Sequence, residues 1–320
     1  MEKSNRKIQI IRGISICAVV MIHSNVSGIG AVLDRPFLNF CVAMFIFLSG
    51  YLTRIPVQSV KLLYKRRILK VLIPYVFWTF LYAAENADVL EIPILLITAN
   101  AAAPLYYISV YIQLVLLTPL AVILLYSSHS WIGWLLTPVS LLILRYGGIF
   151  IHIPLGPFSI SQLFLPWFIY YYLGLALGNH RVSCSLGYKT SLFVYFCAII
   201  LSEIEGILWF RYGNFDMSTT QIRITSMITS VAAILLVYRY LEDRNIPFSN
   251  HFGTKMIAKV GDYSFGIYFC HIAIMKILSY LPGYQSILFP INSFLILLVS
   301  VLFIWLIKRI LGKYSFIIGF

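Results

Sequence analysis

Residues 288–307 read LFPINSFLILLVSVLFIWLI, a stretch of twenty residues without a charged side chain. A helix needs about 20 consecutive, mainly apolar residues to cross the hydrocarbon core of a bilayer. This stretch is therefore long enough to span a membrane. Similar apolar runs, separated by Gly, Pro and charged residues, predict nine further helices. They lie near residues 8–28, 37–54, 71–90, 105–126, 131–150, 163–179, 190–210, 220–240 and 260–281.

The composition of the whole chain agrees with this prediction. Of its 320 residues, 60% are apolar and 11% are charged, whereas a soluble domain is about 25% charged. Inside a bilayer no water can bind backbone N–H and C=O groups, so a spanning segment must be a helix or a strand of a closed barrel. Runs of about 20 residues are too long for the strands of a membrane barrel. The sequence therefore predicts an all-α, polytopic membrane bundle of about ten transmembrane helices, forming a single domain over residues 1–320.

The charge balance predicts the orientation of the chain. Its 24 lysines and arginines exceed its 11 acidic residues and give a net charge of +13. In a soluble chain this excess would indicate nucleic-acid binding, but no basic segment alternates with exposed aromatic residues, so we expect no nucleic-acid partner. In a membrane protein, lysines and arginines gather in cytoplasmic loops. With the N-terminus inside, about three-quarters of them fall in the inner segments, which predicts that both termini are cytoplasmic.

The cysteines and histidines give no sign of a metal centre. The five cysteines are scattered without a Cys-x-x-Cys pair, and four lie inside apolar runs, where cysteine is a small packing residue. No two His, Cys or carboxylate side chains share a recognised ligand spacing. We expect neither a metal site nor a bound cofactor.

The first predicted helix carries two ionisable residues, Arg12 and His23. Burying such residues in lipid costs a few kcal/mol or more, so they commonly face the interior of a helix bundle. Eleven steps of 100° end only about 20° past three full turns, so the two side chains share one face, about 16 Å apart along the axis. Spacing alone leaves two alternatives open. One is a functional pair; the other is a cation that reaches the membrane surface and a histidine hydrogen-bonded in the core.

This arginine–histidine spacing resembles that of acyltransferase family 3, whose members carry Arg, ten further residues and then His in the first helix. Other segments resemble the family in the same order along the chain. They are Phe45-Ile46-Phe47-Leu48-Ser49-Gly50-Tyr51, Tyr64 to Lys70, Pro74-Tyr75, Pro104 to Tyr107, Leu173-Gly174 and Ser264 to His271. Each match is short, but the ordered set extends over nearly the whole chain.

Two residues depart from the family pattern. The family commonly has two arginines three residues apart in the inner segment, whereas here Arg67 is followed by Lys70. Lysine keeps the charge and loses the bidentate fork, which puts the role of that position in doubt. Tyr107 stands where many members have tryptophan.

The resemblance implies a membrane O-acyltransferase of the stand-alone type, without a hydrolase-like domain, in the inner (plasma) membrane. Such an enzyme moves an acyl group, typically acetyl, from a cytoplasmic acyl-CoA to a hydroxyl of a cell-surface polysaccharide or a lipid-linked glycan precursor. The co-substrate implied is acetyl-CoA or another acyl-CoA. The other partners implied are the glycan acceptor and membrane lipid.

The resemblance also implies roles for single residues. A sugar hydroxyl is a poor nucleophile and needs a base, and His23 would supply it. Arg12, nearer the inside, would hold the donor's phosphates or steer its acyl arm. The candidates for binding the donor's phosphates are Arg66, Arg67 and Lys70, and those for orienting His23 or binding the acceptor are Glu203 and Glu85.

Other interpretations stay open on the sequence. Topology alone also requires dense positive charge in the inner segment 65–70, and it explains the acids on the outer side equally well. A helix bundle with a buried arginine and histidine would also suit a polytopic transporter or exporter, although no paired halves are visible. The same fold could instead sense a small ligand. His271, in the predicted helix 260–281, has no charged partner at helical spacing, and we expect it to serve packing.

Overall fold

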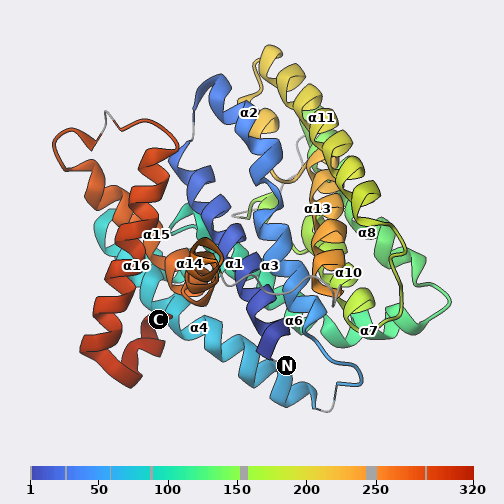
Figure 1. Ribbon diagram of the computed structural model, residues 1–320, viewed down its shortest axis with the longest axis horizontal. Coiled ribbons are helices and arrows are strands. Elements are labelled where there is room, and N and C mark those ends of the chain that lie inside the picture. The colour runs from blue at the N-terminus through green and yellow to red at the C-terminus, as the bar shows by residue number, and fades with distance from the viewer. Residues whose placement is uncertain are drawn as a thin grey trace. The chain divides into compact units, whose positions relative to one another are not determined.

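The computed structural model describes residues 2–25, 27–57, 59–86, 89–151, 158–242, 251–284 and 287–320, without the side chains of residues 2–5, 85, 86 and 89. Most of these residues belong to helices, and none of them belongs to a β-strand (Figure 1). The all-α class predicted from the sequence is confirmed.

Seven helical segments among the described residues are long and apolar enough to cross a membrane. They are Arg6–Ser24, Gly28–Tyr51, Val60–Ala84, Trp131–Phe150, Tyr188–Arg211, Phe215–Glu242 and Ile291–Ile318. The pair Ile92–Thr98 and Ala103–Leu116, bent by 50°, is an eighth candidate, and Leu165–Gly178 and Ser264–Ser279 are shorter apolar helices. The chain is therefore a multi-pass membrane protein. Each of the ten predicted segments overlaps one of these, whereas the number of ten crossings stays a prediction.

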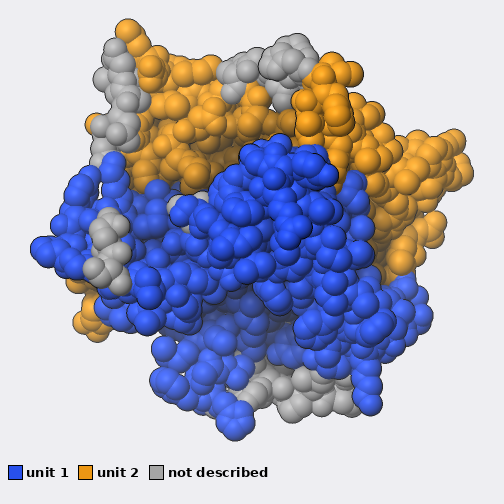
Figure 2. Space-filling model, turned by 90° about the horizontal axis from the view of Figure 1, so that it is seen from above, with its two compact units in different colours: residues 1–45, 183–303 blue, residues 46–182, 304–320 orange. Residues whose placement is uncertain are grey.

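The chain divides into two compact units, which Figure 2 shows in different colours. The first comprises residues 1–45 and 183–303, and the second comprises residues 46–182 and 304–320. The single domain predicted over the whole chain stays a prediction, and each unit is described by itself.

In the first unit, α1 packs against α14 and also contacts α2 and α15. The yellow α11 and the orange α13 lie side by side in Figure 1. The helices of this unit are α1 (Glu2–Ser24), α2 (Gly28–Leu38), the first half of α3 (Phe40–Tyr51), α11 (Tyr188–Arg211), α12 (Phe215–Thr219), α13 (Ile224–Glu242), α14 (Phe252–Asp262), α15 (Ser264–Ser279) and most of α16 (Ile291–Leu311).

In the second unit, α10 is the buried element, since all its residues except Ile169 are buried. A helix that is apolar all round is expected to be surrounded by protein or lipid. The α-helices of this unit, besides the end of α3, are α4 (Val60–Asn86), α5 (Ile92–Thr98), α6 (Tyr106–Leu116), α7 (Thr118–Tyr126), α8 (Trp131–Ser140), α9 (Gly147–Phe150) and α10 (Phe168–Gly178). Its shorter helical segments are η1 (Val89–Glu91), η2 (Ala103–Leu105), the π-helical η3 (Leu141–Tyr146), η4 (Ile160–Gln162), η5 (Leu165–Trp167) and η7 (Gly312–Ile318).

Two glycines let α3 and α10 approach closely within the second unit. A Cβ on Gly174 would overlap the carbonyl oxygen of Phe47, and a Cβ on Gly50 would overlap that of Tyr171. Small residues at such crossings allow helix backbones to touch in membrane proteins. Gly50 and Gly174 each belong to a segment that carries the family resemblance. The contact between the two glycines therefore brings these two segments together.

The structure extends two helices beyond their predicted N-terminal ends. Residues 29–36, which lie between two predicted helices, belong to α2, and α4 begins at Val60 instead of near residue 71. Charged residues interrupt the apolar pattern in both places, so the apolar pattern alone predicted that both helices begin later in the chain. Lysine and arginine are nevertheless good helix formers, so the basic segment 65–70 is helical and not a loop.

Candidate functional site

Arg12 and His23 both lie on α1, which is one uninterrupted α-helix. Their eleven-residue spacing therefore places the two side chains on one face, about 16 Å apart along the helix axis. Both residues are half-buried. His23 stands in the last turn of the helix, whereas Arg12 stands near its middle.

Polar groups from two other helices bind the end of α1 that carries His23. On α2, Nη2 of Arg35 donates to the carbonyl oxygen of Ile22 over 3.1 Å. On α16, the hydroxyls of Ser293 and Ser24 are 2.6 Å apart, and Nδ2 of Asn292 donates to the carbonyl oxygen of Ser24 over 3.2 Å. These bonds fix the backbone immediately before and after the histidine.

A second histidine lies beside His23. The ring of His271, on α15, has its centre 5.2 Å from that of His23, with 49° between the ring planes. His271 is almost 250 positions further along the chain than His23, so the contact joins helices near the two ends of the sequence. The expectation that His271 serves packing rested on spacing within one helix, which contains no information about such a neighbour.

The Arg12 half of α1 is held against α14. A Cβ on Gly13, the residue after Arg12, would overlap the carbonyl oxygen of Ile257. The two backbones can approach this closely only because position 13 has no side chain. The position of Arg12 is therefore set by a direct contact between the two helices.

The three donor-binding candidates lie on α4 in the second unit. Arg66 and Lys70 are exposed and one helical turn apart. Arg67 is half-buried, and its Nη1 donates to the carbonyl oxygen of Ser49 over 3.1 Å and to the hydroxyl of Ser49 over 3.3 Å. Arg67 thus joins α4 to the end of α3, a contact that the charge pattern did not predict.

Of the two acidic candidates, Glu203 and Glu85, the structure describes the side chain of Glu203 alone. Glu203 lies half-buried on α11, and its Oε2 is enclosed without a hydrogen-bond partner among the described residues. No hydrogen bond or ion pair joins Glu203 to His23 in this part of the chain. The side chain of Glu85 lies outside the described residues. The roles predicted for both residues stay predictions.

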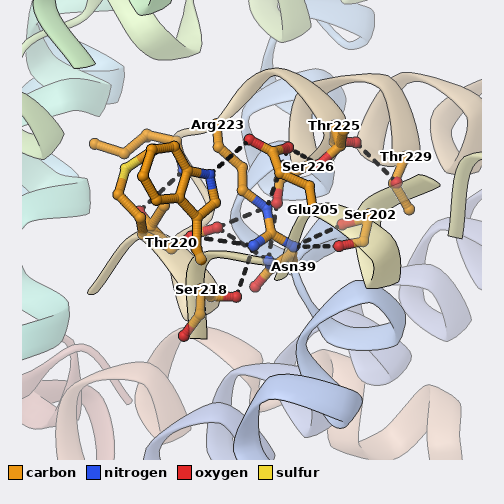
Figure 3. Close-up of polar contacts among 12 residues, drawn as sticks. Asn39, Ser202, Glu205, Ser218, Thr220, Arg223, Thr225, Ser226 and Thr229 are labelled. Carbon is orange, nitrogen blue, oxygen red and sulfur yellow. Dashed lines mark hydrogen bonds and ion pairs between the residues drawn. The ribbon is translucent and has the colours of Figure 1, made fainter. Parts of the chain in front are cut away.

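The most deeply buried charge among the described residues of the first unit was not one of the predicted site residues. Arg223, directly before α13, is 0% exposed. Its Nη1 donates to the carbonyl oxygens of Met217 and Ser218 over 3.1 and 2.6 Å, and its Nη2 donates to the carbonyl and hydroxyl oxygens of Ser202 over 2.8 and 2.9 Å (Figure 3). Its Nε lies 3.8 Å from the carboxylate of Glu205. A buried arginine is tolerated when protein oxygens and a carboxylate surround its guanidinium in this way.

Residues close to Arg223 in the chain also make hydrogen bonds to the junction between α2 and α3. Glu205 also accepts a hydrogen bond from the hydroxyl of Thr225 on α13. Asn39, at the junction, donates to the carbonyl oxygen of Thr220 over 3.2 Å and to the hydroxyl of Ser226 over 3.1 Å (Figure 3). The cluster therefore connects α11, α13 and the α2–α3 junction.

A signal for Arg223 was present in the sequence. The residue follows the mainly polar run 216–221, near the outer end of the predicted helix 220–240, where arginines are scarce in membrane proteins. An arginine on that side calls for a specific reason. Here the reason is a set of protein oxygens that bind its guanidinium.

The side chains around His23 can carry out acid–base chemistry on a hydroxyl. An imidazole can accept a proton, and the nearby amide, hydroxyl and guanidinium groups can bind the oxygens of a polar substrate. Among the described residues, no group of three or more His, Cys, Asp or Glu is arranged to hold a metal ion.

Comparison with known protein families identifies the family of the chain. Residues 5–309 match the family model of acyltransferase family 3, which is described as an acyltransferase domain. No curated protein and no solved structure matches the chain. The matched range includes Arg12, His23 and the basic segment 65–70, as well as His271.

Proposed function

The chain belongs to acyltransferase family 3 and is a membrane acyltransferase, and from this premise we propose that it is an O-acetyltransferase of cell-surface glycans. It transfers an acetyl group from cytoplasmic acetyl-CoA to a hydroxyl of a polysaccharide or of a lipid-linked precursor. It resides in the inner (plasma) membrane and crosses it ten times, with both termini in the cytoplasm. The observation that carries the proposal is the position of His23, half-buried at one end of α1 and on the same face as Arg12.

His23 is the general base of the proposed reaction. It takes the proton of the acceptor hydroxyl while the hydroxyl oxygen forms a bond to the acetyl carbon of the thioester. The carbon–sulfur bond then breaks, and the departing sulfur receives the proton from His23. The products are the O-acetylated glycan and free coenzyme A.

The proposed donor site uses positive charge on α4. Coenzyme A carries phosphate groups, and charge-assisted hydrogen bonds to phosphate are among the strongest in proteins. The exposed Arg66 and Lys70 and the half-buried Arg67 support this role. Arg12 steers the acyl arm of the donor on the face of α1 that carries His23.

The proposed acceptor site surrounds the His23 end of α1. Arg35 and Asn292 are held there by the bonds described above, and each is a donor that can also reach a sugar hydroxyl. Glu203, on α11 of the same unit, supplies a carboxylate for the same purpose, and the role predicted from the sequence for Glu85 is the same. Under the proposed orientation this end of α1 faces the outer side, from which the glycan approaches.

Transfer of a labelled acetyl group tests the proposed function. Proteoliposomes containing the purified protein receive acetyl-CoA labelled in the acetyl group, together with a lipid-linked glycan fraction extracted from bacterial membranes. We expect the label to enter the glycan as an alkali-labile ester, with release of an equal amount of coenzyme A. Empty liposomes are the control. Absence of both label and thiol release would contradict the proposal, and movement of unlabelled glycan across the bilayer would indicate an exporter.

Replacing Arg67 tests the donor site. Arg67→Ala should weaken coenzyme A binding by about 1.5–3 kcal/mol, or roughly 10- to 100-fold, because a charge-assisted contact to phosphate is lost. Arg67→Lys should recover only part of the affinity, since a point charge lacks the fork. Titration calorimetry with coenzyme A measures the dissociation constants.

Lys61→Ala is the matched control for Arg67→Ala, because Lys61 is an exposed cation on the same helix, outside the predicted site. It should leave the dissociation constant almost unchanged. Equal dissociation constants for the wild type and Arg67→Ala would return the segment 65–70 to a purely topological role.

Single cysteines test the proposed orientation. In a background in which the five native cysteines are replaced by alanine, a membrane-impermeant maleimide added to intact cells should react with Tyr212→Cys. The same reagent should reach Ser128→Cys and Phe320→Cys only after the cells are opened. Tyr212 is 81% exposed, and Ser128 is exposed as well. Reaction of Phe320→Cys in intact cells would require an odd number of crossings.

A further inference from the structure

His271 is a buried histidine with one unpaired ring nitrogen. The residue is 1% exposed. Its Nδ1 lies 2.9 Å from the carbonyl oxygen of Ile267, one turn earlier on α15. Its Nε2 is enclosed and has no hydrogen-bond partner among the described residues. Buried polar side-chain atoms in proteins nearly always have a partner, so an orphan of this kind calls for an explanation.

The contact with Ile267 fixes which nitrogen of His271 carries the proton. A carbonyl oxygen can only accept a hydrogen bond, so Nδ1 must be the donor. In the neutral ring, Nε2 then has a free lone pair and can only accept. His271 therefore presents an acceptor of fixed direction and needs a donor.

The ring of His23 is in position to supply that donor. The two ring centres are 5.2 Å apart, and each ring nitrogen lies on the perimeter of its ring. A nitrogen of each ring can therefore come within hydrogen-bonding distance after rotation of the His23 ring about its terminal side-chain torsion, which is a soft one. The bonds that Ser24 makes to Ser293 and Asn292 hold the backbone next to His23 while the ring turns.

We propose that His271 is the positioning partner of His23, with its Nε2 accepting the N–H of the His23 ring nitrogen that faces it. The inference rests on the proposed role of His23 as general base. A base is effective when a second group fixes its tautomer and its direction, as in other nucleophile–base–orienter arrangements. His271 does this as a neutral acceptor.

The pair accounts for every proton in the transfer. The His23 nitrogen that faces the acceptor takes the hydroxyl proton as the new carbon–oxygen bond forms. Its other nitrogen keeps its own N–H, which stays bonded to Nε2 of His271 and helps to stabilise the positive ring. When the carbon–sulfur bond breaks, the first nitrogen gives its proton to the sulfur, and both histidines return to their starting forms.

Two variants of His271 separate positioning from packing. The amide of asparagine places an N–H near the position of Nδ1, and the amide of glutamine places an oxygen near the position of Nε2. His271→Gln thus keeps the acceptor that faces His23, whereas His271→Asn keeps the donor to Ile267. We expect His271→Asn to lower kcat by about 10- to 100-fold, the same order as the loss of a group that orients a metal-binding histidine. His271→Gln should retain most of the wild-type kcat.

The Michaelis constant for acetyl-CoA should stay unchanged in both variants, because His271 acts only through His23. For the same reason, His271→Asn should cause no further loss in a His23→Ala background. Activity of His271→Asn equal to or above that of His271→Gln would overturn the proposal, as would a further loss in that background. Melting temperatures establish that each variant is folded.

A spectroscopic measurement decides the inference without any turnover. In protein labelled with the heavy nitrogen isotope on its histidine rings, the His23–His271 bond should give one hydrogen-bonded ring N–H signal, in addition to that of the His271 Nδ1–H that donates to Ile267. His23→Ala and His271→Asn should each remove that signal, and His271→Gln should keep it. Its absence from the wild type would overturn the inference. A wild type that shows the signal and yet transfers no acetyl group would contradict only the proposed function.

Discussion

Purified His23→Ala protein should fold normally and lose acetyl transfer by a factor of about 100 or more, because general-base catalysis contributes about 10²- to 10⁴-fold. The loss should appear in kcat, while the Michaelis constant for acetyl-CoA changes little, since the proposed donor site lies on α4. The measurement is the rate of acceptor-dependent thiol release from acetyl-CoA.

The matched control is His129→Ala. His129 is exposed in a short connection between α7 and α8, where its Nδ1 lies 3.2 Å from the hydroxyl of Ser128 and its backbone N–H donates to the hydroxyl of Ser127. Its removal should leave the rate unchanged. A well-folded His23→Ala protein with near-normal turnover would show that another group is the base.

Arg223→Met should strongly destabilise the first unit, lowering the free energy of unfolding by about 3–5 kcal/mol. The variant leaves the carboxylate of Glu205 and the oxygens of Ser202, Met217 and Ser218 without the guanidinium that binds them. Denaturant titration in mixed micelles measures the free energy. The free energy of unfolding of Arg223→Lys should lie between those of the wild type and Arg223→Met. Lysine keeps the charge but cannot bind both the Ser202 oxygens and the carbonyl oxygens of Met217 and Ser218.

Arg211→Met is the control, since Arg211 is an exposed arginine at the end of α11. Surface substitutions usually change stability by no more than about 0.5 kcal/mol. The double variant Arg223→Met/Glu205→Gln should lose less free energy of unfolding than the sum of the losses of the two single variants. In the double variant, no carboxylate is left buried without its cation. Equal stabilities of Arg223→Met and Arg211→Met would mean that the buried bonds contribute little.

The helical class and the placement of two site residues on one face were predictable from the sequence. Both depend on properties of a single segment, namely its apolar length and its 3.6-residue period. The spacing of Arg12 and His23 could therefore be interpreted without a structure, and the helical ladder of α1 agrees with it.

Contacts between distant segments were not predictable in the same way. The partners of His23, Arg67 and Arg223 come from other helices, and a period within one helix contains no information about which helix packs beside it. A histidine with a hidden neighbour and one that merely packs look alike in the sequence. The basic segment on α4 shows the same limit, because its charges are visible but the bond from Arg67 to Ser49 is not.

The Arg223 cluster also bears on how the protein is made. The partners that bind its guanidinium (Ser202, Glu205, Met217 and Ser218) all precede it in the chain. During synthesis they have therefore left the ribosome before the arginine emerges. An arginine alone in lipid is costly, but this one can enter the bilayer already bound to α11. Helices α11 and α13 are thus suited to insert into the bilayer together as a hairpin. Arg223, which lies on the side where arginines are scarce, then enters the hydrocarbon with its partners already bound.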